Sequence, residues 1–151
     1  MITIITVGKK HDPLLADATT DYEKRLHAPF QVRWVFLPHS ASDGLAARRS
    51  ESQAILAMLK PTEYVMLLDE RGKLLDSLAF SAKLTALSVG SRPVVIIIGG
   101  AYGVDETLTK RADFVWSLSP LVFPHRLVRL ILTEQIYRAQ AIDGGLKYHH
   151  E

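Results

Sequence analysis

The chain has 151 residues and no cysteine; 48% of its residues are hydrophobic, 23% are charged, and the formal net charge is +2. These values are ordinary for one folded domain, and they exclude disulfides, thiolate nucleophiles and cysteine-ligated zinc. They also exclude recognition of nucleic acid through bulk positive charge, so any contact with RNA must come from a local basic surface.

Hydrophobic periodicity predicts five strands that alternate with five helices. The strands are expected at residues 2–7, 31–37, 64–68, 94–98 and 114–117. The helices are expected at residues 14–26, 46–59, 77–89, 105–111 and 126–142. Asp12, Asp76 and Asp105 stand where N-terminal helix caps belong.

The alternation predicts an α/β fold, a parallel sheet with helices on both faces, in a single domain over residues 1–151. Ligands in such sheets bind beyond the carboxyl ends of the strands. The longest strongly apolar run, residues 94–98, is far too short to cross a membrane, so no membrane contact is expected. We expect a cytoplasmic protein.

Two polar features accompany these elements. In the helix expected at 46–59, Ala47 should face the core while Arg48, Arg49 and Glu51 should face solvent. A polar turn is expected at residues 69–73, directly after the third strand.

A glycine-rich segment, residues 99–103 (GGAYG), directly follows the most apolar strand. Glycine lets backbone N–H groups approach a ligand and permits turns with positive φ. The spacing is neither GxGxxG nor GxxxxGK[ST], so this is not an ordinary dinucleotide or NTPase loop. The segment is either a ligand-binding turn or a tight strand-to-helix connection that needs glycine.

The loop at residues 118–125 (LSPLVFPH) is apolar and also follows a strand. Its backbone amides and carbonyls could hydrogen-bond the edge of an adenine while its side chains enclose the ring, which is a usual composition for a small-molecule site. The alternative is a loop packed into the core, and the loop taken alone favours that alternative.

Tyr148, His149 and His150 lie together near the end of the sequence. Histidine can act as a base near neutral pH, so this segment is a candidate for proton transfer. The alternative is a frayed segment without a chemical role. Two neighbouring histidines make a poor metal site, and no metal is expected.

The helix expected at 126–142 carries charged side chains among leucines and isoleucines. Arg126 and Arg129 lie one turn apart, as do Glu134 and Arg138. They form a solvated face with intrahelical pairs, a subunit interface, or an edge that faces RNA, and the pattern leaves these interpretations open.

Five segments, taken together and in this order, resemble the RlmH family, SPOUT-class methyltransferases that act on N3 of a pseudouridine in 23S rRNA. The similarity covers nearly the whole chain, and the combination is specific although each segment alone would be weak. The segments are ITIITVGK at 2–9, IIGGAYG at 97–103, SLS with FPH in 117–125, Arg129 with EQIYRA at 134–139, and Tyr148-His149.

The resemblance implies a SPOUT-type α/β knot, in which the C-terminal part of the chain threads a deep trefoil knot that holds S-adenosyl-L-methionine. It also implies a homodimer in which the tail of one subunit completes the site of the other. The cofactor-binding residues that it implies are Leu68, Gly99, Gly100, Leu118, Ser119, Pro120, Leu121, Val122 and Phe123. The substrate-binding residues that it implies are His125, Arg129 and His150.

The activity implied is transfer of the cofactor's methyl group to N3 of pseudouridine in the 23S rRNA of the assembled ribosome. Tyr148 and His149 would be the catalytic residues, positioning the base or accepting the N3 proton. The alternatives are a SPOUT methyltransferase for another RNA, a non-catalytic ribosome-binding relative, and an α/β protein that binds a small molecule unrelated to RNA. In one departure from the family, His150 replaces the usual Lys or Arg, so a fixed cation becomes pH-dependent.

Overall fold

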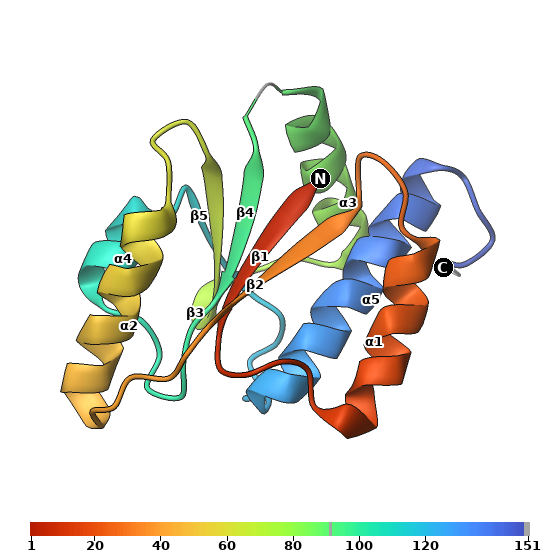
Figure 1. The fold of residues 1–151 in the computed structure, drawn as a ribbon. Helices are drawn as coiled ribbons and strands as arrows, with labels where there is room; N and C mark the ends of the chain where they lie inside the picture. The colour runs from red at the N-terminus through yellow and green to blue at the C-terminus, as the bar shows by residue number, and fades with distance from the viewer. Residues whose placement is uncertain (91, 150–151) are drawn as a thin grey trace.

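The computed structural model describes residues 1–90 and 92–149, and within them strands and helices alternate along the chain (Figure 1). The elements are β1 (Ile2–Val7), α1 (Pro13–Arg25), β2 (Val32–Leu37), α2 (Gly44–Met58), β3 (Tyr64–Leu74), α3 (Ser77–Val89), β4 (Val94–Ile98), α4 (Glu106–Arg111), β5 (Phe114–Ser117) and α5 (His125–Asp143). The predicted element order is therefore confirmed.

The five strands form one sheet in the order β2-β1-β4-β3-β5, and every neighbouring pair is parallel. Val94 of β4 stands opposite Ile2 of β1 and Tyr64 of β3, so the strands start level. Their carboxyl ends consequently meet at one edge, which is the edge where such sheets bind ligands. We call it the carboxyl edge.

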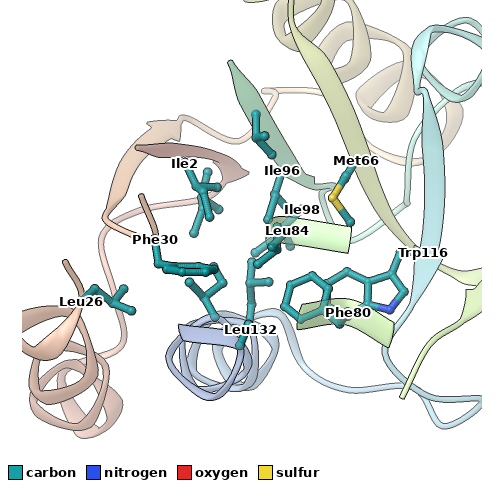
Figure 2. Packing of buried hydrophobic residues seen from close by; sticks show 14 residues of the cluster. Ile2, Leu26, Phe30, Met66, Phe80, Leu84, Ile96, Ile98, Trp116 and Leu132 are labelled. Atoms are coloured by element: carbon teal, nitrogen blue, oxygen red, sulfur yellow. The ribbon is translucent and has the colours of Figure 1, made fainter. Parts of the chain in front are cut away.

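Helices cover both faces of the sheet, as predicted, with α1, α3 and α5 on one face and α2 and α4 on the other (Figure 1). Successive strand residues point to opposite faces, so neighbours such as Ile96 and Ile97 join different cores. Figure 2 shows the first core, where the rings of Phe80 and Trp116 stack 4.3 Å apart beside Leu132. Both faces are buried, which explains why the strands read as continuous apolar runs.

Three helices begin where aspartate caps were predicted. Asp12, Asp76 and Asp105 accept hydrogen bonds from the backbone N–H groups of Leu14, Ala79 and Leu108, at 2.9, 2.7 and 2.9 Å. Each bond satisfies an N–H group that the first turn of a helix leaves without a partner. The starts of α1, α3 and α4 were therefore predictable from single residues.

The third strand is longer than predicted. A polar turn was expected at residues 69–73, but β3 continues to Leu74 after an irregularity in pairing between Leu68 and Lys73. Gly72 makes the continuation possible, because a Cβ there would lie 2.6 Å from the backbone carbon of Trp116. The charged residues fit because Glu70, Arg71 and Lys73 are exposed along this extension, while the partly buried Asp69 pairs with Arg71. The predicted knot stays a prediction.

Candidate functional site

A cavity of about 460 Å³ opens at the carboxyl edge beyond β3, β4 and β5. Its volume lies within the range of small-molecule sites, roughly 300–1,000 Å³. Residues predicted to hold a cofactor or substrate line it: Leu68, Gly99, Gly100, Leu118, Ser119, Leu121, Val122, Phe123 and His125. Pro120, predicted with them, is exposed and is not part of the lining.

The glycine-rich segment forms one wall of this cavity and is also a tight turn. The N–H group of Gly103, whose φ is +72°, donates to the carbonyl of Gly100 at 2.9 Å. A Cβ on Gly99 would lie 2.8 Å from Val104 Cγ1, and one on Gly100 would collide with the carboxylate of Glu51. The two interpretations of this segment therefore do not exclude each other, since close packing behind the turn leaves its backbone facing the cavity.

Helix α2 holds the glycine turn from behind. Arg48 Nε donates to the carbonyl of Val104 at 2.5 Å, and Ser52 Oγ accepts the N–H group of Asp105 at 2.9 Å. Glu51 lies between them, only 6% exposed, and its Oε1 accepts the N–H group of Ser40 at 3.0 Å. The prediction that Arg48 and Glu51 face solvent was wrong.

A signal for this contact was present in the spacing. Arg48, Glu51, Ser52 and Ile55 recur at intervals of three and four residues, so they share one stripe of the helix. Ile55 is fully buried, and the stripe that contains it must face the protein. The polarity of these side chains suggested contact with solvent, but their periodicity indicated that they face the protein.

The loop after β5 forms the opposite wall and is braced by its own serines. Ser117 Oγ donates to the carbonyl of Ser119 at 2.9 Å, and Ser119 Oγ accepts the N–H group of Leu121 at 3.0 Å. Leu121 and Val122 remain 70% and 76% exposed although they line the cavity. An apolar wall that is this open can contact a ligand on one side and a second protein surface on the other.

His125, the first residue of α5, also lines the cavity. Burial lowers the pKa of its imidazole, and the positive charges of Arg129 and His39 lower it further, while Glu51 and a hydrogen bond with Gly99 oppose the shift. The ring is therefore neutral at pH 7 and can both donate and accept a hydrogen bond.

Arg129 lies one turn further along α5 and is 6% exposed. Its guanidinium donates to three carbonyls at the end of β1: Val7 at 3.1 Å, Lys9 at 2.9 Å and Lys10 at 3.3 Å. Burial lowers the pKa of the group, and the carbonyl dipoles compensate for its lost hydration. Its observed contacts fix the β1–α1 connection, and direct contact with a substrate stays a prediction.

The tail residues lie elsewhere. The Tyr148 hydroxyl donates to Glu134 Oε1 at 3.2 Å and lies 3.3 Å from the Tyr22 hydroxyl, while His149 Nδ1 is 3.4 Å from Arg138. None of them lines the cavity. Glu134 is nine residues beyond His125 in α5, which corresponds to roughly 13 Å along the helix. One chain therefore does not bring its described tail to its own cavity.

Burial raises the pKa of the Tyr148 hydroxyl far above its usual range, and the hydrogen bond with Tyr22 and the charge of Glu134 raise it further. This phenol stays protonated at neutral pH and acts as a hydrogen-bond donor. His150, the third predicted residue of the tail, lies outside the described residues.

The described residues form neither a metal site nor a membrane-spanning helix. No three His, Asp or Glu side chains in residues 1–90 and 92–149 gather closely enough to hold a metal ion. No helix in the same part of the chain combines the length and the apolar character needed to cross a membrane.

Comparison with known proteins places these features in context. A family model described as "Predicted SPOUT methyltransferase" matches residues 1–149. The chain is similar to proteins named ribosomal RNA large subunit methyltransferase H: it is 40% identical to the one from Bifidobacterium adolescentis and 39% identical to one from Desulfitobacterium hafniense, each over 98% of both chains. It is 35% identical to the Pseudothermotoga lettingae protein over 99% of both chains.

Proposed function

The chain belongs to the SPOUT methyltransferase family, and from that premise we propose that it transfers a methyl group from S-adenosyl-L-methionine to N3 of a pseudouridine in 23S rRNA of the ribosome. The observation that carries the proposal is the cavity at the carboxyl edge, whose walls are the segments that resemble the family's cofactor site. Full-length similarity to rRNA methyltransferases supports the RNA target. Such an enzyme would work in the cytoplasm, where ribosomes are.

The cavity has the properties that this methyl donor requires. The apolar side chains of Leu68, Leu118 and Phe123 can enclose an adenine ring, and the backbone of Gly99 and Gly100 can approach the ligand closely. Bound there, the cofactor would supply an electrophilic methyl group on a sulfonium sulfur. The protein's own contribution is to hold the target base so that N3 faces that methyl group in line.

The chemistry also needs a place for one proton. N3 of neutral pseudouridine carries a hydrogen, and that proton must leave before the nitrogen electron pair can form a bond to carbon. We assign the proton to the histidine of the tail, His149, and base orientation to the hydroxyl of Tyr148, because a phenol with a strongly raised pKa is a donor and a weak base.

A homodimer would unite the cavity with the tail. The exposed Leu121 and Val122 beside the cavity offer an apolar surface for a second subunit, and the tail lies about two to three helical turns away from its own cavity. In this arrangement Tyr148 and His149 of one subunit would act on a base held beside the cofactor of the other. The trefoil knot, implied by the same resemblance, would shape that cofactor site.

The deciding experiment is transfer of labelled methyl from S-adenosyl-L-methionine to ribosomes from a strain that lacks its own enzyme for this position, with nucleoside mass spectrometry of the product. N3-methylpseudouridine in 23S rRNA is expected. Cofactor binding without transfer to ribosomes would overturn the rRNA assignment, and tRNA would then be tested as the substrate. Transfer to no RNA would leave a binding role.

A further inference from the structure

The connection between β1 and α1 is an unusually well-anchored turn at the carboxyl edge. It begins at Gly8, whose φ is +115°, and continues through Lys9 and Lys10 to His11. A side chain at Gly8 would lie 3.0 Å from the guanidinium of Arg129 and 3.2 Å from the ring of His39. Because β1 and β4 are parallel neighbours, this turn lies beside the glycine turn that forms the cavity wall (Figure 1).

Arg129 determines which way the turn faces. Its guanidinium lies inside the protein and donates hydrogen bonds to the carbonyls of Val7, Lys9 and Lys10. The backbone oxygens of both lysines therefore point into the protein, and their side chains are exposed. His125 and Val128 of α5 line the cavity, and Arg129 follows them in the same helix. One helix therefore orients both the cavity wall and the β1–α1 turn.

Lys9 and Lys10 carry exposed ammonium groups at this turn. In residues 1–90 and 92–149, neither ammonium group lies within ion-pair distance of a carboxylate. Other cations near this edge are already engaged: Arg126 pairs with Asp12 at 3.0 Å and Arg71 with Asp69 at 2.8 Å. A chain with a net charge of only +2 thus presents two adjacent free positive charges next to its cavity.

We propose that the turn over residues 8–11 is a phosphate clamp, in which Lys9 and Lys10 bind the RNA backbone beside the target nucleotide. Arg129 is a positioning residue that acts through the carbonyls of this turn. The proposal rests on the proposed function, because it names the surface by which the same site takes its RNA. The turn would also be the local basic surface that a chain of low net charge needs to bind RNA.

The test compares two variants with the same loss of charge. K9Q/K10Q removes both cations of the turn. K24Q/K60Q removes two exposed lysines at the ends of α1 and α2, and since these helices run back across the sheet, their ends lie at the opposite edge. For each variant, KM for ribosomes, kcat and the affinity for S-adenosyl-L-methionine are measured across a series of salt concentrations.

K9Q/K10Q is expected to raise KM for ribosomes several-fold at physiological salt and to leave kcat and cofactor affinity unchanged. The slope of log affinity against log salt should become shallower by about 1.5, since each lost phosphate contact removes roughly 0.7–0.9. K24Q/K60Q should match the wild type. Equal effects of the two variants, or no effect of either, would overturn the clamp.

Arg129→Lys provides a second readout. A lysine keeps the charge but cannot reach three carbonyls in a fixed fork, so the salt slope should fall as in K9Q/K10Q while the total charge is unchanged. A slope equal to that of the wild type, in a folded Arg129→Lys protein, would remove Arg129 from the proposal. Wild-type enzyme that methylates no ribosomes would instead contradict the proposed function, so the two failures are distinguishable.

Discussion

Tyr148 of the tail and His125 of the cavity are both held uncharged by their surroundings. Tyr148 is held in its protonated form by burial, by Tyr22 and by Glu134, whereas His125 is held neutral by burial and by Arg129. A donor and a neutral ring suit a reaction that binds an uncharged base and removes one proton from it. The tail and the edge of the cavity are thus chemically complementary.

Two substitutions in the tail should separate proton transfer from positioning. Tyr148→Phe is expected to lower kcat about tenfold without changing the shape of the pH–rate profile, because the phenol does not ionise between about pH 6 and 9. His149→Gln should lower kcat more, because it removes the proposed proton acceptor and keeps a polar side chain of similar size. Stopped assays of methyl transfer across this pH range provide the measurement, and a changed profile in Tyr148→Phe would reverse the two assignments.

Gly100 should tolerate no side chain. In Gly100→Ala the methyl group would collide with the Glu51 carboxylate, which is buried and fixed by the N–H group of Ser40. Overpacking of this kind costs about 1–3 kcal/mol, so the melting temperature should fall by several degrees and cofactor binding should weaken.

Gly90→Ala is the matched control for that substitution, since the nearest atom to its Cβ is the Leu87 carbonyl at 3.4 Å. Calorimetry of unfolding and of cofactor binding checks both variants. Equal melting temperatures for the two would show that the Glu51 side chain moves aside without cost.

Buried polar contacts at this scale were the least predictable part of the molecule. Helical spacing indicates that Glu51 faces inward, but its contact with Gly100, like the contact of Arg129 with three carbonyls, depends on how separate elements meet. The aspartate caps, by contrast, act within four residues and were predicted correctly.

At the level of elements, α2 supports the glycine turn that forms one wall of the cavity, without contributing to the sheet. Its side chains Arg48 and Ser52 bind the backbone of the segment that follows the glycine turn. The residue next to Arg48, Arg49, is exposed. A comparison of substitutions at Arg48 and at Arg49 therefore separates the support of the glycine turn from the effect of losing a surface charge.

Arg48→Met should weaken cofactor binding while Arg49→Met should not. The first substitution leaves the Val104 carbonyl without its donor and loosens the turn, at a cost of about 1–3 kcal/mol in unfolding free energy. The second removes an equal charge from the surface. Isothermal titration with S-adenosyl-L-methionine measures the difference, and equal affinities in both variants would contradict a supporting role for α2.

The elements themselves were predictable because both faces of the sheet are buried. Strands such as β4 carry apolar residues at every position, and helices return at a regular interval. The extension of β3 was missed because Asp69, Glu70 and Arg71 resemble a turn, and only the close approach at Gly72 shows that the chain continues along β5. The polarity of a short segment does not indicate that it pairs with a strand about forty residues later in the chain.

For the whole molecule, the distance between tail and cavity makes a prediction about assembly. Ser119→Trp, which fills the cavity, and His149→Ala, which removes the base, should each be inactive alone. Mixed and reassembled from unfolded chains, they should recover up to about a quarter of wild-type activity, because half of the dimers pair an intact cavity with an intact tail at one of two sites.

Each variant taken alone through the same unfolding and refolding is the control for that mixture. A site completed within one subunit would give no recovery on mixing, which would contradict the proposed homodimer arrangement. Light scattering of the same samples establishes whether dimers have formed, so that a failure to assemble is recognised.

The cavity walls follow β3, β4 and β5, α5 closes them and Arg48 of α2 also lines them, so the cavity draws on residues from Arg48 to Val128. During synthesis, a growing chain therefore has no complete cavity until the first turn of α5, which contains Val128, has left the ribosome. A ligand that binds this cavity would consequently protect only chains that have folded up to α5, in proportion to its concentration, and would leave shorter chains open to proteolysis.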